Sequence, residues 1–358
     1  MNETTNQSHP MNALLQARDI FSHAADMGFG DIHFKHDAAT GLRAIIAIHS
    51  TKLGPALGGC RCVPYSSADA ALNDVMDLAQ AMSYKAAMAG LPLGGGKAVI
   101  IKPKQIKDRT ALFEAYGNFV NELGGRYISS VDSGTGTKDM DIAARKTQFV
   151  RSTSDKGDPS PSTAFGVRRG IEAAVKHKLN RDNLENIHIA IQGVGHVGYH
   201  LAKELYQLGA KLTVCDINKT LLARCTEEFG AAIVSPDKIH TIEADVLAPC
   251  ALGGVINEFS IKELNTQIIA GATNNILADA ELADELHAEG ILYAPDYVIN
   301  AGGLMQVWIE DETALQNKVS NIYDTLLNLF QRSDEQNQSP AIVVNNIAEE
   351  IIYSSKTK

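Results

Sequence analysis

The feature that most constrains the fold is a set of three glycines, Gly193, Gly195 and Gly198, between an apolar strand-like segment and a helical one. In a strand–turn–helix unit, glycines at this spacing allow a tight turn, let a phosphate approach the backbone, and let helix and strand pack closely. The start of the helix binds phosphate through unpaired N–H groups and its dipole. The motif therefore predicts a unit that binds a dinucleotide.

Strand-like and helical segments alternate around this motif. The predicted strands are residues 187–192, 211–216, 231–234, 245–248, 268–271 and 291–293, and the first predicted helices between them are 197–208 and 219–229. Strands joined by such short helical crossovers form a parallel sheet with helices on its faces. We therefore expect an α/β fold in this half of the chain.

Asp216 closes the second predicted strand, 18 residues after Gly198. A carboxylate in this place accepts hydrogen bonds from the ribose hydroxyls of adenosine and repels the additional phosphate of NADP. The cofactor prediction is therefore NAD. The simpler alternative is an ordinary Gly-rich turn, with Asp216 capping a helix.

The first half of the chain has a different order of elements. Residues 44–49 form a predicted strand, and a long helix is predicted from Ser66 or Ser67 to about Ala89, where Gly90 ends it. A Gly-rich loop and a strand over residues 98–101 are expected to follow.

Two polar segments mark boundaries further along the chain. The Pro-rich stretch 154–162 is predicted to connect two domains, which suit a length of 358 residues better than one. Residues 312–355 are expected to be helical, with a loop over the polar residues 333–339.

Composition argues against several classes of function. The net charge of −10 argues against a nucleic-acid partner. No apolar run reaches the length of a membrane span, and the polar residues 1–12 lack the apolar core of a signal peptide, so we expect a cytoplasmic protein. The five cysteines, including Cys60 and Cys62, lack further ligands at metal spacing and are predicted to be small apolar core residues, so no metal site is expected.

Three ionisable residues are candidates for chemistry. Lys97 follows three glycines, which let a substrate reach the backbone, and a lysine enclosed near a second cation releases its proton more easily and can act as a base. Lys85 can supply that cation and pair with a substrate carboxylate. Asp132 can handle a proton or charge on a substrate amine. The simpler interpretations are a solvated helix lysine for Lys85 and a turn cap for Asp132.

Eight blocks of sequence occur in an order that is typical of a known family. They lie at residues 54–61, 82–85, 94–97, 132–135, 158–163, 193–198, 248–253 and 294–303. Through them the chain resembles the glutamate/leucine/phenylalanine/valine dehydrogenase family, in particular its leucine and phenylalanine branch. The resemblance implies an α/β fold in which a cleft separates an N-terminal α/β catalytic domain from a C-terminal Rossmann-type dinucleotide-binding domain.

The resemblance also implies a division of the chain. Residues 13–151, together with a C-terminal helix at about 340–358, are expected to form the substrate and catalytic domain, and residues 152–339 the NAD-binding domain. Residues 1–12 are expected to form a disordered tail. The terminal helix is expected to cross back to the first domain, and the implied assembly is a homo-oligomer, either a dimer or an octamer.

By the same resemblance, Lys85 holds the substrate carboxylate, Lys97 activates water against an imine carbon, and Asp132 assists proton transfer at the amine. The residues implied to line the substrate site are Leu57, Gly58, Gly59, Ser130 and Asn300. Those implied to contact the cofactor are Gly193, Gly195, His196, Val197, Gly198, Asp216, Thr163, Asn274, Cys250 and Ala251. The implied reaction is oxidation of an amino acid by NAD to a 2-keto acid, with release of ammonia.

Leu57 bears on the identity of the substrate. Glutamate-specific members of the family usually carry a lysine here that pairs with the side-chain carboxylate, whereas Leu57 suits an apolar side chain. Ser130 replaces a small apolar residue. Leucine or another branched-chain amino acid is the first prediction, and valine, phenylalanine and tryptophan stay open. Two other classes of protein are less favoured by the sequence. One is a non-catalytic dinucleotide-binding regulator, and the other is a 2-hydroxy-acid dehydrogenase, which would need a His–carboxylate pair that the sequence does not offer in a matching context.

Overall fold

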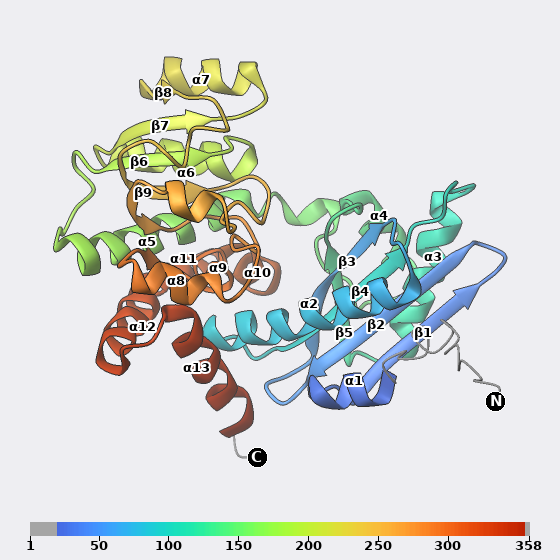
Figure 1. Ribbon diagram of the computed structural model, residues 1–358. Helices are drawn as coiled ribbons and strands as arrows, with labels where there is room; N and C mark the ends of the chain where they lie inside the picture. Colours follow the sequence, from blue (N-terminus) through green and yellow to red (C-terminus); the bar gives the residue numbers. More distant parts are fainter. Residues whose placement is uncertain (1–19, 355–358) are drawn as a thin grey trace, which may run out of the picture.

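The computed structural model describes residues 20–354, so the predicted tail at 1–12 lies outside the described residues. The chain forms two lobes, each built on one β-sheet, and helix α2 (Ala68–Met88) lies between them (Figure 1). The predicted α/β fold class is confirmed. Within residues 20–354, no helix is long and apolar enough to span a membrane.

The first sheet contains five strands in the order β1-β2-β4-β3-β5. Their bounds are β1 (Asp31–Asp37), β2 (Leu42–Ser50), β3 (Ala56–Val63), β4 (Gly94–Ile101) and β5 (Tyr127–Val131). Strands β3, β4 and β5 are parallel, and β2 runs antiparallel to both of its neighbours. Helix α2 covers one face, and α3 (Arg109–Glu122) and α4 (Thr137–Ala143) cover the other; α1 (Ile20–Asp26) precedes the sheet.

The long predicted helix is confirmed as α2. Ser67 caps its start, because the side chain accepts a hydrogen bond from the backbone nitrogen of Ala70 at 3.0 Å. Val75 and Ala79 pack on the sheet. Gly90 follows the helix with a φ of +58°, a left-handed conformation that glycine adopts easily.

The Gly-rich segment before Lys97 is a strand, so the predicted loop is wrong. Strand β4 begins at Gly94, which places Lys97 inside the strand. A Cβ atom on Gly95 would overlap the backbone nitrogen of Ser83 in α2. Glycine is therefore required where the helix crosses the strand, and residues without side chains give no strand signal in a sequence.

The second sheet contains six parallel strands in the order β11-β10-β9-β6-β7-β8. Their bounds are β6 (His188–Gln192), β7 (Lys211–Cys215), β8 (Ala232–Ile233), β9 (Ala244–Pro249), β10 (Thr266–Ile269) and β11 (Leu292–Tyr293). Counted from β6, this is the strand order of dinucleotide-binding α/β folds, in which the chain reverses direction across the sheet between the first and fourth strands. The alternation predicted from the sequence is confirmed.

Most helices belong to the second half of the chain. They are α5 (Ser160–Leu179), α6 (His196–Gln207), α7 (Lys219–Phe229), α8 (Leu282–Ala288), α9 (Asp296–Ile299), α10 (Gly302–Trp308), α11 (Glu312–Ser320), α12 (Ile322–Gln336) and α13 (Pro340–Ser354), with 3-10 turns at Ser154–Lys156 and Ser260–Glu263.

Two predicted loops are shorter than expected. Helix α5 already begins at Ser160, because Pro161 is tolerated in a first helical turn, where no N–H donor is needed. Helix α12 continues to Gln336, so most of the predicted loop at 333–339 is helical. Ser333 is buried there, and its hydroxyl donates to the carbonyl of Gln338. Polar residues 333–336 belong to an amphipathic helix, but their composition is also typical of a loop.

Helix α13 lies against α2. Ala348 and Ile352 of α13 pack on Ala87. The hydroxyl of Tyr84 donates a hydrogen bond to Glu349 Oε1 at 2.7 Å. The last helix therefore contacts the helix that lies between the lobes.

Candidate active site

Lys97 and Asp132 meet on the α2 face of the first sheet. Lys97 lies opposite Ala47, whose side chain packs under α2, so Lys97 points to the same side. Asp132 directly follows β5, and its Oδ2 lies 2.5 Å from Lys97 Nζ. Their side chains are only 9% and 19% exposed, respectively. Two residues far apart in sequence thus form a close ion pair under a helix.

Gly58 and Gly59 differ in what they contact. A Cβ atom on Gly59 would lie 2.5 Å from the carbonyl oxygen of Val131 and 2.8 Å from the Cβ of Asp132, so only glycine lets the end of β5 approach here. A Cβ atom on Gly58 would instead overlap the carbonyl oxygen of Gly96. The hydroxyl of Tyr127 donates to the Gly58 carbonyl at 2.6 Å. The structure therefore places Gly59 against Val131 and Asp132, and Gly58 against Gly96.

Asp132 has a partner that sequence analysis did not single out. Arg61 Nε lies 3.4 Å from Asp132 Oδ2, and the backbone nitrogen of Ser133 donates to Oδ1 at 2.7 Å. Burial opposes ionisation of Asp132, but Lys97 and Arg61 outweigh it and hold its pKa below the ordinary value. The carboxylate is therefore charged at neutral pH. Arg61 lies in β3 and Asp132 directly after β5, so no sequence spacing links them.

Lys85 reaches from α2 towards the second lobe. Its Nζ donates to Asn274 Oδ1 at 3.3 Å, and Asn300 Nδ2 donates to the same oxygen at 2.8 Å. Burial lowers the pKa of Lys85 to about 8, and the charge of Lys97 adds to this, while nearby carboxylates, Asp296 foremost, oppose it. Lys85 is therefore mostly charged at neutral pH.

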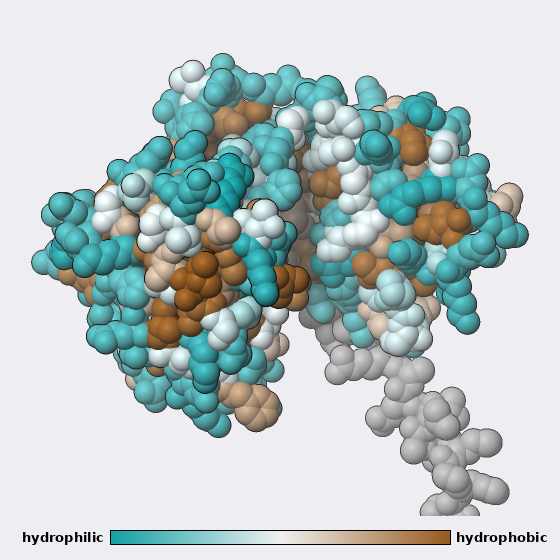
Figure 2. Space-filling view, turned by 90° about the horizontal axis from the view of Figure 1, so that it is seen from above, coloured by the Kyte–Doolittle hydropathy of each residue, from teal (hydrophilic) through white to brown (hydrophobic). Residues whose placement is uncertain are grey.

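The two lobes meet at this point, and a furrow separates them in the view from above (Figure 2). Three buried polar atoms on the second lobe, Gln192 Oε1, Thr273 Oγ1 and Asn300 Oδ1, have no hydrogen-bond partner among the described residues. A buried polar atom without a partner is costly, so such atoms mark places where a polar ligand is accommodated. Lys85 connects this region to the ion pair on the first lobe.

Leu57 and Ser130 lie near the same face of the sheet. Leu57 is buried and shares an apolar cluster with Ala86 and Ile128. Ser130 is also buried, and its Oγ lies 2.6 Å from Ser152 Oγ. The surroundings of the ion pair thus combine an aliphatic wall with one pair of hydroxyl groups.

The glycine motif forms a cradle at the carboxyl edge of the second sheet. Gly193 has a φ of +91°, which other residues rarely adopt, and a Cβ atom on Gly198 would overlap the Gly193 carbonyl oxygen. Apart from Gly195 itself and its chain neighbours, no atom of the described residues lies within 4 Å of the position that a Cβ on Gly195 would take. Gly195 also precedes α6 and has no side chain to cap it. The open space and the helix start fit a dinucleotide phosphate.

Asp216 lies beside this cradle. Its Oδ2 accepts from the backbone nitrogen of Val194 and its Oδ1 from that of Asn218, both at 2.8 Å. Carboxylate oxygens have further lone pairs for a ribose. Sequence analysis missed Ile217 and Leu252, which follow β7 and β9 and are 94% and 83% exposed. Aliphatic side chains this exposed beside a cofactor cradle suit an aromatic ring.

The other predicted cofactor residues lie around the same edge. His196 is exposed at the start of α6, with Nδ1 3.4 Å from Asp158 Oδ2. Thr163 Oγ1 donates to the carbonyl of Pro159 at 3.0 Å. The remaining ones are Val197, half-buried in α6, and Cys250 and Ala251, which follow β9. Across residues 20–354, no group of three His, Cys, Asp or Glu side chains could hold a metal ion.

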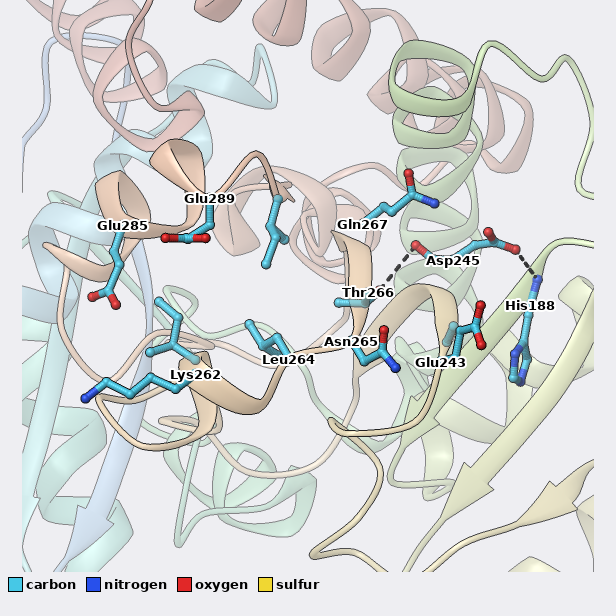
Figure 3. A pocket seen from close by; sticks show the side chains of 13 residues that line it. His188, Glu243, Asp245, Lys262, Leu264, Asn265, Thr266, Gln267, Glu285 and Glu289 are labelled. Atoms are coloured by element: carbon cyan, nitrogen blue, oxygen red, sulfur yellow. Dashed lines mark hydrogen bonds between the residues drawn. The ribbon is translucent and has the colours of Figure 1, made fainter.

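A cavity of about 800 Å³ opens at the opposite edge of the second sheet. His188 and Thr266 line it where β6 and β10 begin, and Figure 3 shows Glu285 of α8 on its far side. Asp245 Oδ2 accepts from the backbone nitrogen of His188 at 2.8 Å there. Because parallel α/β sheets bind ligands at the carboxyl ends of their strands, this cavity is not the cofactor site.

The two lobes match the two parts of one family. The family described as "Glu/Leu/Phe/Val dehydrogenase, dimerisation domain" matches residues 29–149, and that described as "Glutamate/Leucine/Phenylalanine/Valine dehydrogenase" matches residues 158–226 and 216–349. The chain belongs to the Glu/Leu/Phe/Val dehydrogenase family. The family predicted from the sequence blocks is confirmed, and the protein is an amino-acid dehydrogenase.

Individual members of this family resemble the chain over nearly its whole length. The leucine dehydrogenase of Geobacillus stearothermophilus is 44% identical over 346 residues, which cover 94% of each chain. The L-tryptophan dehydrogenase of Nostoc punctiforme is 42% identical over 343 residues, 94% of this chain and 97% of that one. The crystal structure of the Nostoc L-tryptophan dehydrogenase matches with a TM-score of 0.85 and 40% identity, over 94% of this chain and 99% of that one. The glutamate dehydrogenase of Thermus thermophilus, at 18% identity and a TM-score of 0.72, shares the fold.

Proposed function

We propose that this amino-acid dehydrogenase uses NAD to oxidise an apolar L-amino acid, with leucine or another branched-chain amino acid as its first substrate. Amino acid, NAD and water give the 2-keto acid, ammonium, NADH and a proton. The observation that carries the proposal is the convergence of Lys85, Lys97 and Asp132 between the lobes, close to an aliphatic wall that includes Leu57.

Lys85 is proposed to hold the substrate carboxylate. Its charged ammonium donates to Asn274 across the furrow, and a carboxylate is a stronger acceptor than an amide. The Asn300 side chain, which donates to the same amide oxygen, borders that place. The substrate would thereby be fixed with its α-carbon towards Lys97 and Asp132.

Lys97 and Asp132 are proposed to move the protons. When bound, NAD accepts the hydride that leaves the α-carbon of the substrate. Lys97 in its neutral form takes a proton from the water that attacks the imine carbon, and the charged carboxylate of Asp132 stabilises the ammonium that results. The same carboxylate stabilises the positive charge on the substrate nitrogen until ammonia leaves. Little water reaches the pair, which strengthens these interactions.

The residues that would hold the cofactor fit NAD better than NADP. The Gly193–Gly198 turn and the start of α6 would receive the diphosphate, and Asp216 the adenosine ribose. The exposed side chains of Ile217 and Leu252 would flank the adenine. A 2′-phosphate would meet the negative charge of Asp216.

An aromatic substrate, phenylalanine or tryptophan, is the second candidate. It is favoured by the similarity to the L-tryptophan dehydrogenase of Nostoc punctiforme and by the Ser130–Ser152 hydroxyl pair, which makes the surroundings of the ion pair less aliphatic than Leu57 alone would.

A survey of NADH formation decides between the candidates. The purified protein is assayed with NAD and leucine, valine, phenylalanine, tryptophan or glutamate. Branched-chain amino acids should give the highest kcat/KM, and glutamate a value at least about 100-fold lower, because its side-chain carboxylate would be buried without a partner. Glutamate as the best substrate, or no oxidation of any amino acid, would contradict the proposal.

We also infer the organisation of the chain from these contacts. Residues 13–151 with the terminal helix are proposed as one domain and residues 152–339 as the other, supported by the separate sheets and by the contact of α13 with α2. A homo-oligomer, dimer or octamer, is proposed because the matched N-terminal family is described as a dimerisation domain. The cytoplasmic location expected from the sequence is kept as part of the proposal. Light scattering on the purified protein measures the assembly, and a monomer would contradict it.

A further inference from the structure

We propose that Arg61 is a positioning residue that sets the pH at which Lys97 becomes a base, acting through the Asp132 carboxylate. The inference rests on the proposed function, in which Lys97 takes the proton from water. Arg61 does not touch the reacting atoms in this account. It supplies a second cation on the same carboxylate oxygen that Lys97 contacts.

The side chains form a continuous chain of alternating charge. Asp132 Oδ2 lies 2.5 Å from Lys97 Nζ and 3.4 Å from Arg61 Nε. On its other side, Arg61 Nη1 donates to both oxygens of Asp74, at 2.9 and 3.0 Å. The hydroxyl of Tyr65 donates to Asp74 Oδ2 at 2.5 Å. The guanidinium is therefore held between two carboxylates, one of which belongs to the catalytic pair.

Partial burial strengthens the interactions between these charges. The side chains of Arg61 and Asp74 are 24% and 27% exposed. Ion pairs at a fully exposed surface are strongly screened, whereas partly buried charges a few ångströms apart interact several times more strongly than in water. A substitution of Arg61 is therefore expected to change the electrostatic energy of the charged Lys97 side chain.

Arg61 opposes the charged form of Lys97 in two ways. Its guanidinium is permanently charged, so it repels the ammonium of Lys97, and it also takes part of the attraction that Asp132 would otherwise give to Lys97 alone. Without Arg61, the close Lys97–Asp132 pair would retain its proton to higher pH. Removal of the negative charge of Asp74 acts in the opposite direction, because this charge no longer offsets the repulsion between Arg61 and the ammonium of Lys97.

Other charged and titratable groups also face the pair, and apart from Arg61 and Asp74 none of them is substituted in the test. From the packed elements these are Lys85 and Asp74 of α2, Cys60 and Arg61 of β3, Tyr65 after β3, and Asp296 of α9. Burial raises the pKa of the Cys60 thiol, and burial with the Asp74 hydrogen bond raises that of the Tyr65 hydroxyl, so both are neutral at working pH.

The test is the pH dependence of kcat/KM for the best amino-acid substrate in wild type, Arg61→Gln, Arg61→Lys and Asp74→Asn. The substrate amine titrates identically with every variant, so only differences between variants are used. The midpoint of the rise in kcat/KM should move up by about one pH unit in Arg61→Gln and down by a few tenths of a unit in Asp74→Asn. Arg61→Lys keeps the charge but loses the fork geometry, so its rate should fall while its midpoint stays within a few tenths of wild type.

Opposite shifts distinguish this role from a structural one, which would lower rates without moving the midpoints in opposite directions. An unshifted midpoint in folded Arg61→Gln, or shifts of Arg61→Gln and Asp74→Asn in the same direction, would overturn the proposal. If Arg61→Gln does not fold, Asp74→Asn and Arg61→Lys decide: an Asp74→Asn midpoint that fails to move down is the contrary result. Lys97→Ala is assayed alongside, because full activity there contradicts the proposed function itself and not only the part of Arg61.

Discussion

The cofactor edge of the second lobe and the catalytic face of the first are built in contrasting ways. The cofactor edge depends on backbone shape and one carboxylate, all between Gly193 and Asp216. The proposed catalytic face depends on side chains from β3, β4, the residue after β5 and α2, which only the tertiary fold brings together. A short sequence motif can predict a site that is formed by local backbone. It cannot predict a site that is formed by side chains from distant parts of the chain.

The largest expected effect concerns the convergent side chains. Lys97→Ala should lower kcat by about 10²–10⁴-fold, the usual contribution of a general base, and leave NADH binding unchanged because the cradle lies on the other lobe. Steady-state assays and fluorescence titration with NADH measure the two effects. Lys102→Ala, at an exposed lysine just after the same strand, is the control. Near wild-type turnover in Lys97→Ala would remove Lys97 from the mechanism.

The second effect concerns the backbone cradle. A Cβ atom on Gly198 would overlap the Gly193 carbonyl oxygen, so Gly198→Ala should lower both the thermal stability, by about 3 kcal/mol, and NADH affinity. Gly195→Ala meets no atom and should lower affinity with little change in Tm. Thermal melts with and without NADH measure both. Equal Tm losses in the two variants would contradict the cradle geometry.

The third effect concerns cofactor choice. Asp216→Ala should weaken NAD binding by roughly tenfold while changing NADP binding less, because the ribose loses an acceptor and the 2′-phosphate loses a repulsive charge. Dissociation constants for both cofactors measure this. Asp237→Ala, outside the cradle, serves as the control, and an unchanged NAD/NADP preference in Asp216→Ala would count against the ribose contact.

Prediction from the sequence succeeded where a signal is local and failed where it depends on neighbours. The sequence predicts the strand alternation and the glycine turn correctly, but it predicts a loop at Gly94 to Gly96, because only the crossing of α2 explains why a strand lacks side chains there. The boundary of α12 was missed because a polar helix face resembles a loop.

The candidate site shows the same limit. Lys85, Lys97 and Asp132 were singled out through their blocks, and the structure brings them together. Arg61 could not be singled out, because its partner Asp132 lies 71 residues further along the chain. Ile217 could not be either, because its importance lies in exposure, which a sequence does not state.

The smallest expected effect concerns the pH dependence of carboxylate binding. The pKa of Lys85 is lowered to about 8, so its ammonium is present below that pH and lost as the pH rises through it. The affinity for a 2-keto acid, which has no amine to titrate, should therefore fall several-fold per pH unit above about 8. Inhibition constants measured in wild type and in Lys85→Met check this. A pH dependence that persists in Lys85→Met would assign it to another group.

The most direct measurement of the central claim is a crystal structure of the protein with NADH and the 2-keto acid of leucine. The account predicts the ligand carboxylate within hydrogen-bond distance of Lys85 Nζ, the carbonyl carbon facing Lys97 and Asp132, and the aliphatic chain against Leu57. A ligand whose carboxylate is held elsewhere, with Lys97 Nζ turned away from the carbonyl carbon, would contradict it.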